Sequence, residues 1–318
     1  MASELWVRKR ASSSAAGTQR RFDRLRRIQG LDPERDYEEI FRLVTAYEFP
    51  WDYWQSVALA FFRTFAIPSI SALLDETGEI VGHTQKRTDD TLLIMYEMGR
   101  MGLESPEGRA YLRRMNQMHR RYVISNDDHT YIIALFIVVP VRWINRFGWR
   151  RLTLHEQRAL THYGRRLAQL MGIKDVPATF ADFDQFAQSY ERRHFAVTSS
   201  SRRLAEAAMA ITADMLPKSL RGPLKPVMRR FSLAILDDAL LHAVGLPLPS
   251  ERDRRLATWL VRTRGRILRV LPPRPDNRPH RPALATYPNG HQISEIGPAW
   301  LTDGTADEHN NTVKEDRP

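Results

Sequence analysis

Apolar residues recur every three or four positions along most of the chain, and polar residues fill the intervals between them. This spacing is typical of amphipathic helices, and no segment shows the strict alternation of a half-buried strand. Capping residues, glycines and prolines mark where each helix begins and ends. The expected helices cover residues 32–47, 54–66, 70–74, 84–100, 105–122, 131–139, 153–171, 201–215, 225–244 and 250–270, with one more beginning after 179. We therefore predict an all-α protein, a single globular bundle of about ten helices.

The helical pattern divides the chain into a body and two tails. Residues 1–30 are basic and rich in serine and alanine, and residues 272–318 are polar and proline-rich. Such compositions favour disorder because they offer too little apolar surface to bury. We expect one folded domain over residues 31–271 between two disordered tails. Inside it, Pro140 lies in an apolar run and is expected to end or kink the helix there.

The longest apolar run extends from Tyr131 to Val141, about half of the ~20 residues needed to cross a bilayer. We expect a buried core helix there rather than a membrane span. The first residues are basic and are not followed by the apolar segment of a signal peptide. These features predict a cytoplasmic protein, with peripheral contact with a membrane as an alternative.

Composition narrows the chemistry. The 318 residues include no cysteine, which excludes disulfides, zinc–thiolate sites, iron–sulfur clusters, cysteine nucleophiles and thiolate-bound haem. There are 48 Lys and Arg against 37 Asp and Glu, a formal charge of +11. These charges are spread over nearly every helix without a zinc-finger, RNP or helix-turn-helix pattern, so no nucleic-acid partner is expected. For the basic stretch 221–230 and the arginines of the last helix, a solvated face is favoured over a membrane-facing amphipathic surface.

His119 is the first candidate for a functional residue. Together with Leu112, Met115 and Tyr122 it follows the three- and four-residue spacing of one helix face, so it is expected to point into the protein. A core histidine satisfied by a hydrogen bond is one interpretation, and the spacing alone favours it. The other is a neutral imidazole that ligates a haem iron in an apolar pocket.

Arg87 and Thr91 are the second candidates, because they are four residues apart and project from one face of the preceding helix. They fit a polar pair beside a bound cofactor, where arginine stabilises negative charge and threonine donates a hydrogen bond. Asp89 and Asp90 fit a solvated first turn, where the helix dipole favours acidic residues. The acidic run 126–128 is better explained as the cap of the next helix than as a metal site.

Several short motifs occur in a fixed order and carry a family resemblance. They read FFRTFAIPSISALLDETGEI, KRTDDT, MNQMHRRYVISNDDHTYIIALFIVVP, RFGWRRLT and MGIKDVP. In this order they resemble the catalytic domain of MpaB-type oxygenases and rubber oxygenases (latex-clearing proteins), over about residues 45–270. The resemblance implies an all-helical fold around haem b, with His119 as the proximal iron ligand and Arg87 and Thr91 near the haem.

The resemblance also implies an oxidoreductase that uses dioxygen on an unsaturated apolar substrate. Rubber-cleaving members carry a lysine just before the threonine, where this chain has Asp90, and they are exported. These departures favour a small isoprenoid or lipid-like substrate over a polymer. We expect Arg87 to stabilise negative charge on dioxygen and Thr91 to orient it or a water molecule. The alternative is a non-catalytic helical protein of the same fold that binds lipid or another partner.

Overall fold

A computed structural model describes the backbone of residues 21–214 and 218–302, and side chains except those of 211–221. This part of the chain is helical and contains no strand, which confirms the predicted all-α class. The helices are α2 (Asp23–Gln29), α3 (Tyr37–Leu43), α4 (Pro50–Thr64), α5 (Pro68–Glu76), α6 (Glu79–Gly82), α7 (Thr84–Met101), α8 (Pro106–His119), α9 (Asn126–Phe147), α10 (Leu154–Leu170), α11 (Phe180–His194), α12 (Ser199–Asp214), α13 (Lys218–Ile235), α14 (Asp238–Ala243), α15 (Glu251–Val270) and α16 (Ala299–Thr302). A π-helical turn, η1 (Val44–Glu48), follows α3, and a 3₁₀ turn, η2 (Ile293–Glu295), precedes α16.

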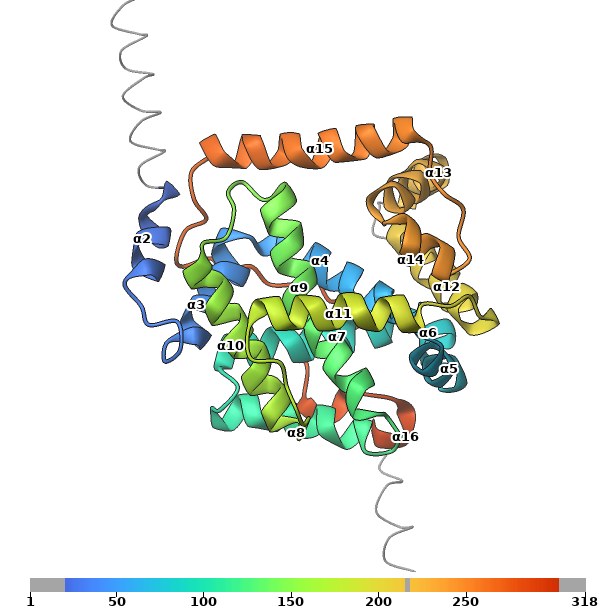
Figure 1. The fold of residues 1–318 in the computed structure, drawn as a ribbon, viewed down its shortest axis with the longest axis horizontal. Coiled ribbons are helices and arrows are strands. Elements are labelled where there is room, and N and C mark those ends of the chain that lie inside the picture. The colour runs from blue at the N-terminus through green and yellow to red at the C-terminus, as the bar shows by residue number, and fades with distance from the viewer. Residues whose placement is uncertain (1–20, 215–217, 303–318) are drawn as a thin grey trace, which may run out of the picture.

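Helix α9 is the central element of the bundle, and α4, α10, α11 and α15 pack around it (Figure 1). It is apolar on nearly all sides, as a helix surrounded by other helices must be. By length and composition α9 could cross a membrane, but 67% of its apolar window is buried inside the protein. Its packing agrees with the core helix expected from the sequence.

Of the two outcomes expected at Pro140, an end to the helix is contradicted, because α9 continues to Phe147. A proline inside a helix removes one backbone hydrogen bond and costs about 3 kcal/mol. Val141, Trp143 and Ile144 beyond the proline are buried in the core. Burial of such side chains is worth about 1.5–3 kcal/mol each, which outweighs the lost bond.

Two other predicted helices have different boundaries. The helix expected over 225–244 is interrupted at Asp237, whose carboxylate accepts the backbone N–H of Leu240 at 3.0 Å and so begins α14. Arg63 of α4 pairs with the same carboxylate. The helix expected from residue 32 begins at Tyr37, because Asp32 caps a separate turn ahead of it by accepting the N–H of Glu34 at 2.8 Å.

Parts of both predicted tails are folded. Ile28 of α2 is fully buried, although residues 1–30 were expected to be disordered. Residues 272–302, here called the C-terminal segment, run back across the bundle. Within them, Asp276 accepts a 2.6 Å bond from Arg24, and the His280 N–H donates to the Ala46 carbonyl at 3.0 Å. The segment is ordered by polar bonds to the body rather than by a core of its own. The remainder of each predicted tail, 1–20 and 303–318, lies outside the described residues.

Candidate functional site

Helices α7 and α8 pack against each other and carry the three residues singled out from the sequence. Arg87 and Thr91 lie one turn apart on α7 and are bonded to each other. The Arg87 guanidinium donates to the Thr91 hydroxyl, which in turn donates to the Arg87 carbonyl at 3.0 Å. The structure therefore brings these two residues together as the spacing predicted.

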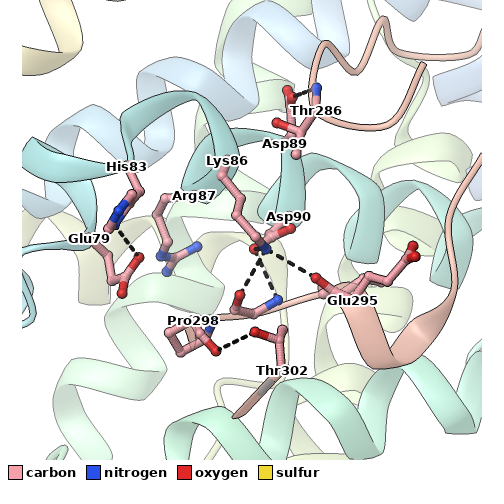
Figure 2. Close-up of polar contacts among 12 residues, drawn as sticks. Glu79, His83, Lys86, Arg87, Asp89, Asp90, Thr286, Glu295, Pro298 and Thr302 are labelled. Carbon is pink, nitrogen blue, oxygen red and sulfur yellow. Dashed lines mark hydrogen bonds and ion pairs between the residues drawn. The ribbon is translucent and has the colours of Figure 1, made fainter. Parts of the chain in front are cut away.

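The Arg87 guanidinium makes no ion pair with any described residue, although it lies well inside the protein. Burial lowers its pKa, and Asp90 and Glu79 act against this shift from a distance. Glu79 instead pairs with His83, at 3.4 Å between Oε2 and Nδ1, and Figure 2 shows Arg87 beside that pair. The aromatic ring of Phe61 lies 5.8 Å from the guanidinium carbon. The result is a cation without an ion-pair partner beside an aromatic ring, on which Asp90 and Glu79 act only through their charges.

His119 is the last residue of α8 and holds an unpartnered nitrogen. Burial lowers the pKa of the imidazole to about 4, and the nearby His129 and Arg87 act in the same direction. His119 is therefore neutral at physiological pH. Its Nδ1 atom is buried and has no hydrogen-bond partner among the described residues. Seven other buried side-chain atoms of the described residues, among them Nε2 of His155, share this state, so the nitrogen is available to a ligand without being unique in this respect.

His129 lies beside His119, which the sequence analysis did not anticipate. The two ring centroids are 5.7 Å apart. Burial lowers the pKa of His129, and the adjacent Asp128 partly offsets the shift. The sequence did contain a clue to this pair. Ser125 caps α9 by accepting the Asp128 N–H at 3.0 Å, so His129 lies near the start of α9, soon after α8 ends at His119.

The donor atoms present fit one bond to a haem iron. The described residues contain no group of three or more His, Asp or Glu side chains that could hold a metal ion by themselves. A haem needs one protein nitrogen, because the macrocycle supplies the other four in-plane ligands. The neutral His119, with its unsatisfied nitrogen, meets that requirement. The carboxylate of Asp128 does not compete, because it accepts hydrogen bonds from Ser69 at 3.0 Å and Tyr190 at 2.8 Å.

Asp89 and Asp90 are buried, so the prediction of a solvated first turn is wrong for them. Asp89 accepts the N–H of Thr286 at 2.7 Å, and Asp90 accepts the N–H of Gly297 at 3.0 Å (Figure 2). Asp90 also pairs with Lys86 at 2.9 Å and accepts the Tyr287 hydroxyl. The prediction failed because these partners belong to the C-terminal segment, about two hundred residues further along the chain.

The C-terminal segment connects α7 to α8. On the α7 side, Lys86 donates to the carbonyl of Gly297 at 2.8 Å. On the α8 side, Arg114 donates to the carbonyls of Ile296 and Ser294, both at 2.7 Å. Gly297 has a φ of +118°, which side chains rarely adopt, and a side chain there would also lie 3.0 Å from the sulfur of Met118, so the position favours glycine. The segment thus helps to set the distance between the helix of Arg87 and the helix of His119.

The fold and the site together define an all-helical protein in which a histidine with an unpartnered ring nitrogen and an arginine–threonine pair lie on two adjacent helices. The sequence matches the family model described as ER-bound oxygenase mpaB/B'/Rubber oxygenase, catalytic domain, over residues 51–266, and the chain belongs to that family. The family predicted from the sequence motifs is confirmed. The matched region includes Arg87, Thr91 and His119 and ends before the C-terminal segment.

Individual relatives have oxygenase names. The chain is 32% identical over 247 residues to ER-bound oxygenase mpaB' of Penicillium brevicompactum, covering 72% of this chain and 57% of the relative. It is 29% identical over 228 residues to ER-bound oxygenase mpaB of Penicillium roqueforti (strain FM164), covering 65% and 75%. The match to the mpaB' relative thus extends over little more than half of that protein's length.

Proposed function

We propose that this protein is a haem b-dependent oxygenase that uses dioxygen to oxidise or cleave an unsaturated apolar substrate, isoprenoid or lipid-like. Membership of a family described as oxygenases supports the reaction class. The observation that carries the cofactor assignment is His119, a half-buried, neutral imidazole whose buried Nδ1 has no partner among the described residues. The haem, when bound, supplies the chemistry of dioxygen, and the protein supplies its ligand and the surrounding charges.

Arg87 supplies positive charge where the reaction develops negative charge. Its guanidinium has no carboxylate partner in the described structure, so its field is not neutralised locally. In a poorly solvated site such a fixed charge acts more strongly than it would in water. Thr91 holds the guanidinium in place by accepting one of its N–H groups. The Thr91 proton is donated to the Arg87 carbonyl, so the hydroxyl has one acceptor lone pair left with which to orient a water molecule, and it can donate to dioxygen only by giving up the bond to the carbonyl.

The substrate class follows from the residues around this pair. Phe61, Leu92 and Met95 provide apolar surface near Arg87 and Thr91. The hydrogen bonds of the Asp90 carboxylate are satisfied by Lys86 and the C-terminal segment, so Asp90 acts on Arg87 through its charge alone. An apolar substrate with few polar groups suits such surroundings. We place the protein in the cytoplasm, in contact with the surface of a membrane where such substrates dissolve.

An absorption spectrum of the protein purified from haem-supplemented cells tests the proposal. We expect a Soret band in the wild type and in His129→Ala, and its loss in His119→Ala. Loss in His129→Ala alone would assign the iron to the other imidazole. A colourless wild-type protein with a helical circular dichroism spectrum would refute the oxygenase and favour a non-catalytic lipid-binding or interaction protein of the same fold.

The role of Arg87 has its own spectroscopic test. In the haem-loaded protein, Arg87→Ala should retain the Soret band but shift the stretching frequency of bound carbon monoxide upward, since a nearby positive charge lowers that frequency. Arg87→Lys keeps the charge and is the matched control. An unchanged frequency in Arg87→Ala would place the guanidinium away from the ligand side of the haem.

A further inference from the structure

Helix α15 exposes a continuous apolar stripe along its outer face. Figure 1 shows α15 along one edge of the bundle, where only one side of it meets other helices. Its inner side is marked by the buried residues Ala257, Val261 and Gly265. The stripe consists of Leu256, Trp259, Leu260, Ile267 and Val270, with exposed fractions between 44% and 69%. Their spacing of three, four and seven residues places all five on one face of the helix.

A row of arginines follows the stripe along one side. The row consists of Arg252, Arg255, Arg262, Arg266 and Arg269, all of them exposed. None of the five forms an ion pair with a residue that the structure describes. Arg264, on the inner side of the same helix, behaves differently: it pairs with Asp52 at 3.1 Å and stacks on Trp51 at 3.8 Å. The outer row therefore carries positive charge that the protein itself does not neutralise.

Part of this row borders a recess of about 350 Å³ between α15 and the turn that joins α9 to α10. Six arginines and no carboxylate line it: Arg146, Arg150, Arg151, Arg262, Arg266 and Arg269. Arg150 is held from behind by Glu48 and Glu156, both at 2.8 Å, while the other five make no ion pair within the described chain. The five guanidinium groups without an ion-pair partner are suited to phosphate and carboxylate groups, which arginine binds through two parallel N–H donors.

We propose that the outer face of α15 and the adjoining recess dock the protein on an anionic lipid bilayer. The apolar stripe enters the boundary between headgroups and acyl chains, and the arginines bind the lipid phosphates and carboxylates. The positive charge of this face favours an anionic bilayer over a second copy of the chain, because a symmetric dimer would bring two rows of arginines together. The stripe selects a bilayer over a soluble polyanion, which would leave Trp259 and Leu260 without a partner.

Vesicle co-sedimentation of the full-length protein tests this surface. We expect binding to vesicles of phosphatidylcholine with phosphatidylserine and little binding to phosphatidylcholine alone. Near a charged membrane each arginine contributes about 1 kcal/mol, so Arg262→Gln/Arg266→Gln/Arg269→Gln should weaken binding about 100-fold. Trp259→Ala/Leu260→Ala should weaken it at least tenfold, since both side chains are exposed in the free protein and become buried in the membrane.

A matched charge control is available on α8 and α11. Arg113→Gln/Arg192→Gln/Arg193→Gln removes the same charge from three exposed arginines that lie on other helices. We expect this control to bind within about twofold of the wild type. Equal losses in the two triple variants would overturn the proposal, as would equal binding to both kinds of vesicle.

Two further outcomes identify another occupant and would also overturn the proposal. One is competition by the soluble headgroup glycerophosphoserine at concentrations equal to the lipid, which would define a free anion site. The other is a dimer in light scattering that Trp259→Ala/Leu260→Ala disperses, without any vesicle binding by the wild type. These results concern α15 alone and leave the haem assignment of His119 unaffected, so the two proposals fail separately.

Discussion

The buried imidazole of His119 makes the stability of the protein depend on pH, and the size of the effect follows from its environment. In the cofactor-free fold, burial lowers its pKa from the ordinary 6.5 to about 4, with His129 and Arg87 acting in the same direction. Between these two values the unfolded chain binds a proton at this position and the folded chain does not. Acid therefore favours unfolding, and the free energy of unfolding falls as the pH is lowered through this interval.

The magnitude can be worked from the two pKa values. Above pH 7 both states are neutral at His119 and the residue contributes no pH dependence. At pH 5 the unfolded state is largely protonated and the folded state is not, which costs about 2 kcal/mol of unfolding free energy. The full effect, about 3 kcal/mol, is reached below the folded-state pKa of about 4.

Urea denaturation at pH 7.5 and pH 5.0 measures this loss. Other buried histidines also titrate in this range, so the informative quantity is the difference between the wild type and His119→Gln, which cannot be protonated. We expect the wild type to lose about 2 kcal/mol more than the variant between the two pH values. His129→Gln, the neighbouring control, should retain most of the wild-type pH dependence. Equal losses in the wild type and His119→Gln would show that the imidazole is not held neutral by burial.

Two buried ionic contacts give further predictions. Asp90→Asn removes the charge partner of Lys86 and the carboxylate that accepts the Gly297 N–H of the C-terminal segment. It should lower the unfolding free energy by about 2–4 kcal/mol and open that segment to limited proteolysis. Glu48→Gln leaves the buried guanidinium groups of Arg24 and Arg150 without their shared carboxylate, and should cost about 3–5 kcal/mol in urea denaturation.

An exposed ion pair is the control for both substitutions. Asp23 pairs with Arg26 on α2, and both side chains are more than half exposed. Asp23→Asn should change the unfolding free energy by less than about 1 kcal/mol, since water solvates the freed partner. A cost as large as that of Asp90→Asn would mean that burial does not determine how much an ion pair contributes to the unfolding free energy.

Features decided by neighbouring residues could be predicted from the sequence. The capping box at Thr153 and Glu156 is present, with the Glu156 N–H donating to the Thr153 hydroxyl at 3.2 Å. The Arg87–Thr91 pair formed as expected, because residues four apart on a helix always face the same way. The all-α class followed from apolar periodicity for the same reason: each helix carries its own pattern.

Features decided by distant residues could not be predicted. The break before α14 depends on Asp237, which is held by Arg63, 174 residues earlier in the chain. The neighbour of His119 depends on how α8 meets α9, so His129 was not recognised as part of the site. The C-terminal segment was expected to be disordered because its composition is polar, and only its bonds across the bundle reveal its order.

The C-terminal segment also explains one departure from the rubber-cleaving members that this chain otherwise resembles. The resemblance to those members implies a lysine at the position where this chain has Asp90. Here the position faces the Lys86 ammonium and the Gly297 N–H, both of which require an acceptor. A lysine would place a second cation against the first and leave the N–H of Gly297 unsatisfied, so the segment could not keep its present path. The aspartate is thus coupled to the segment, which lies beyond the matched residues 51–266. The aspartate therefore belongs to the contacts that connect α7 and α8, and Arg87 provides the positive charge near the site.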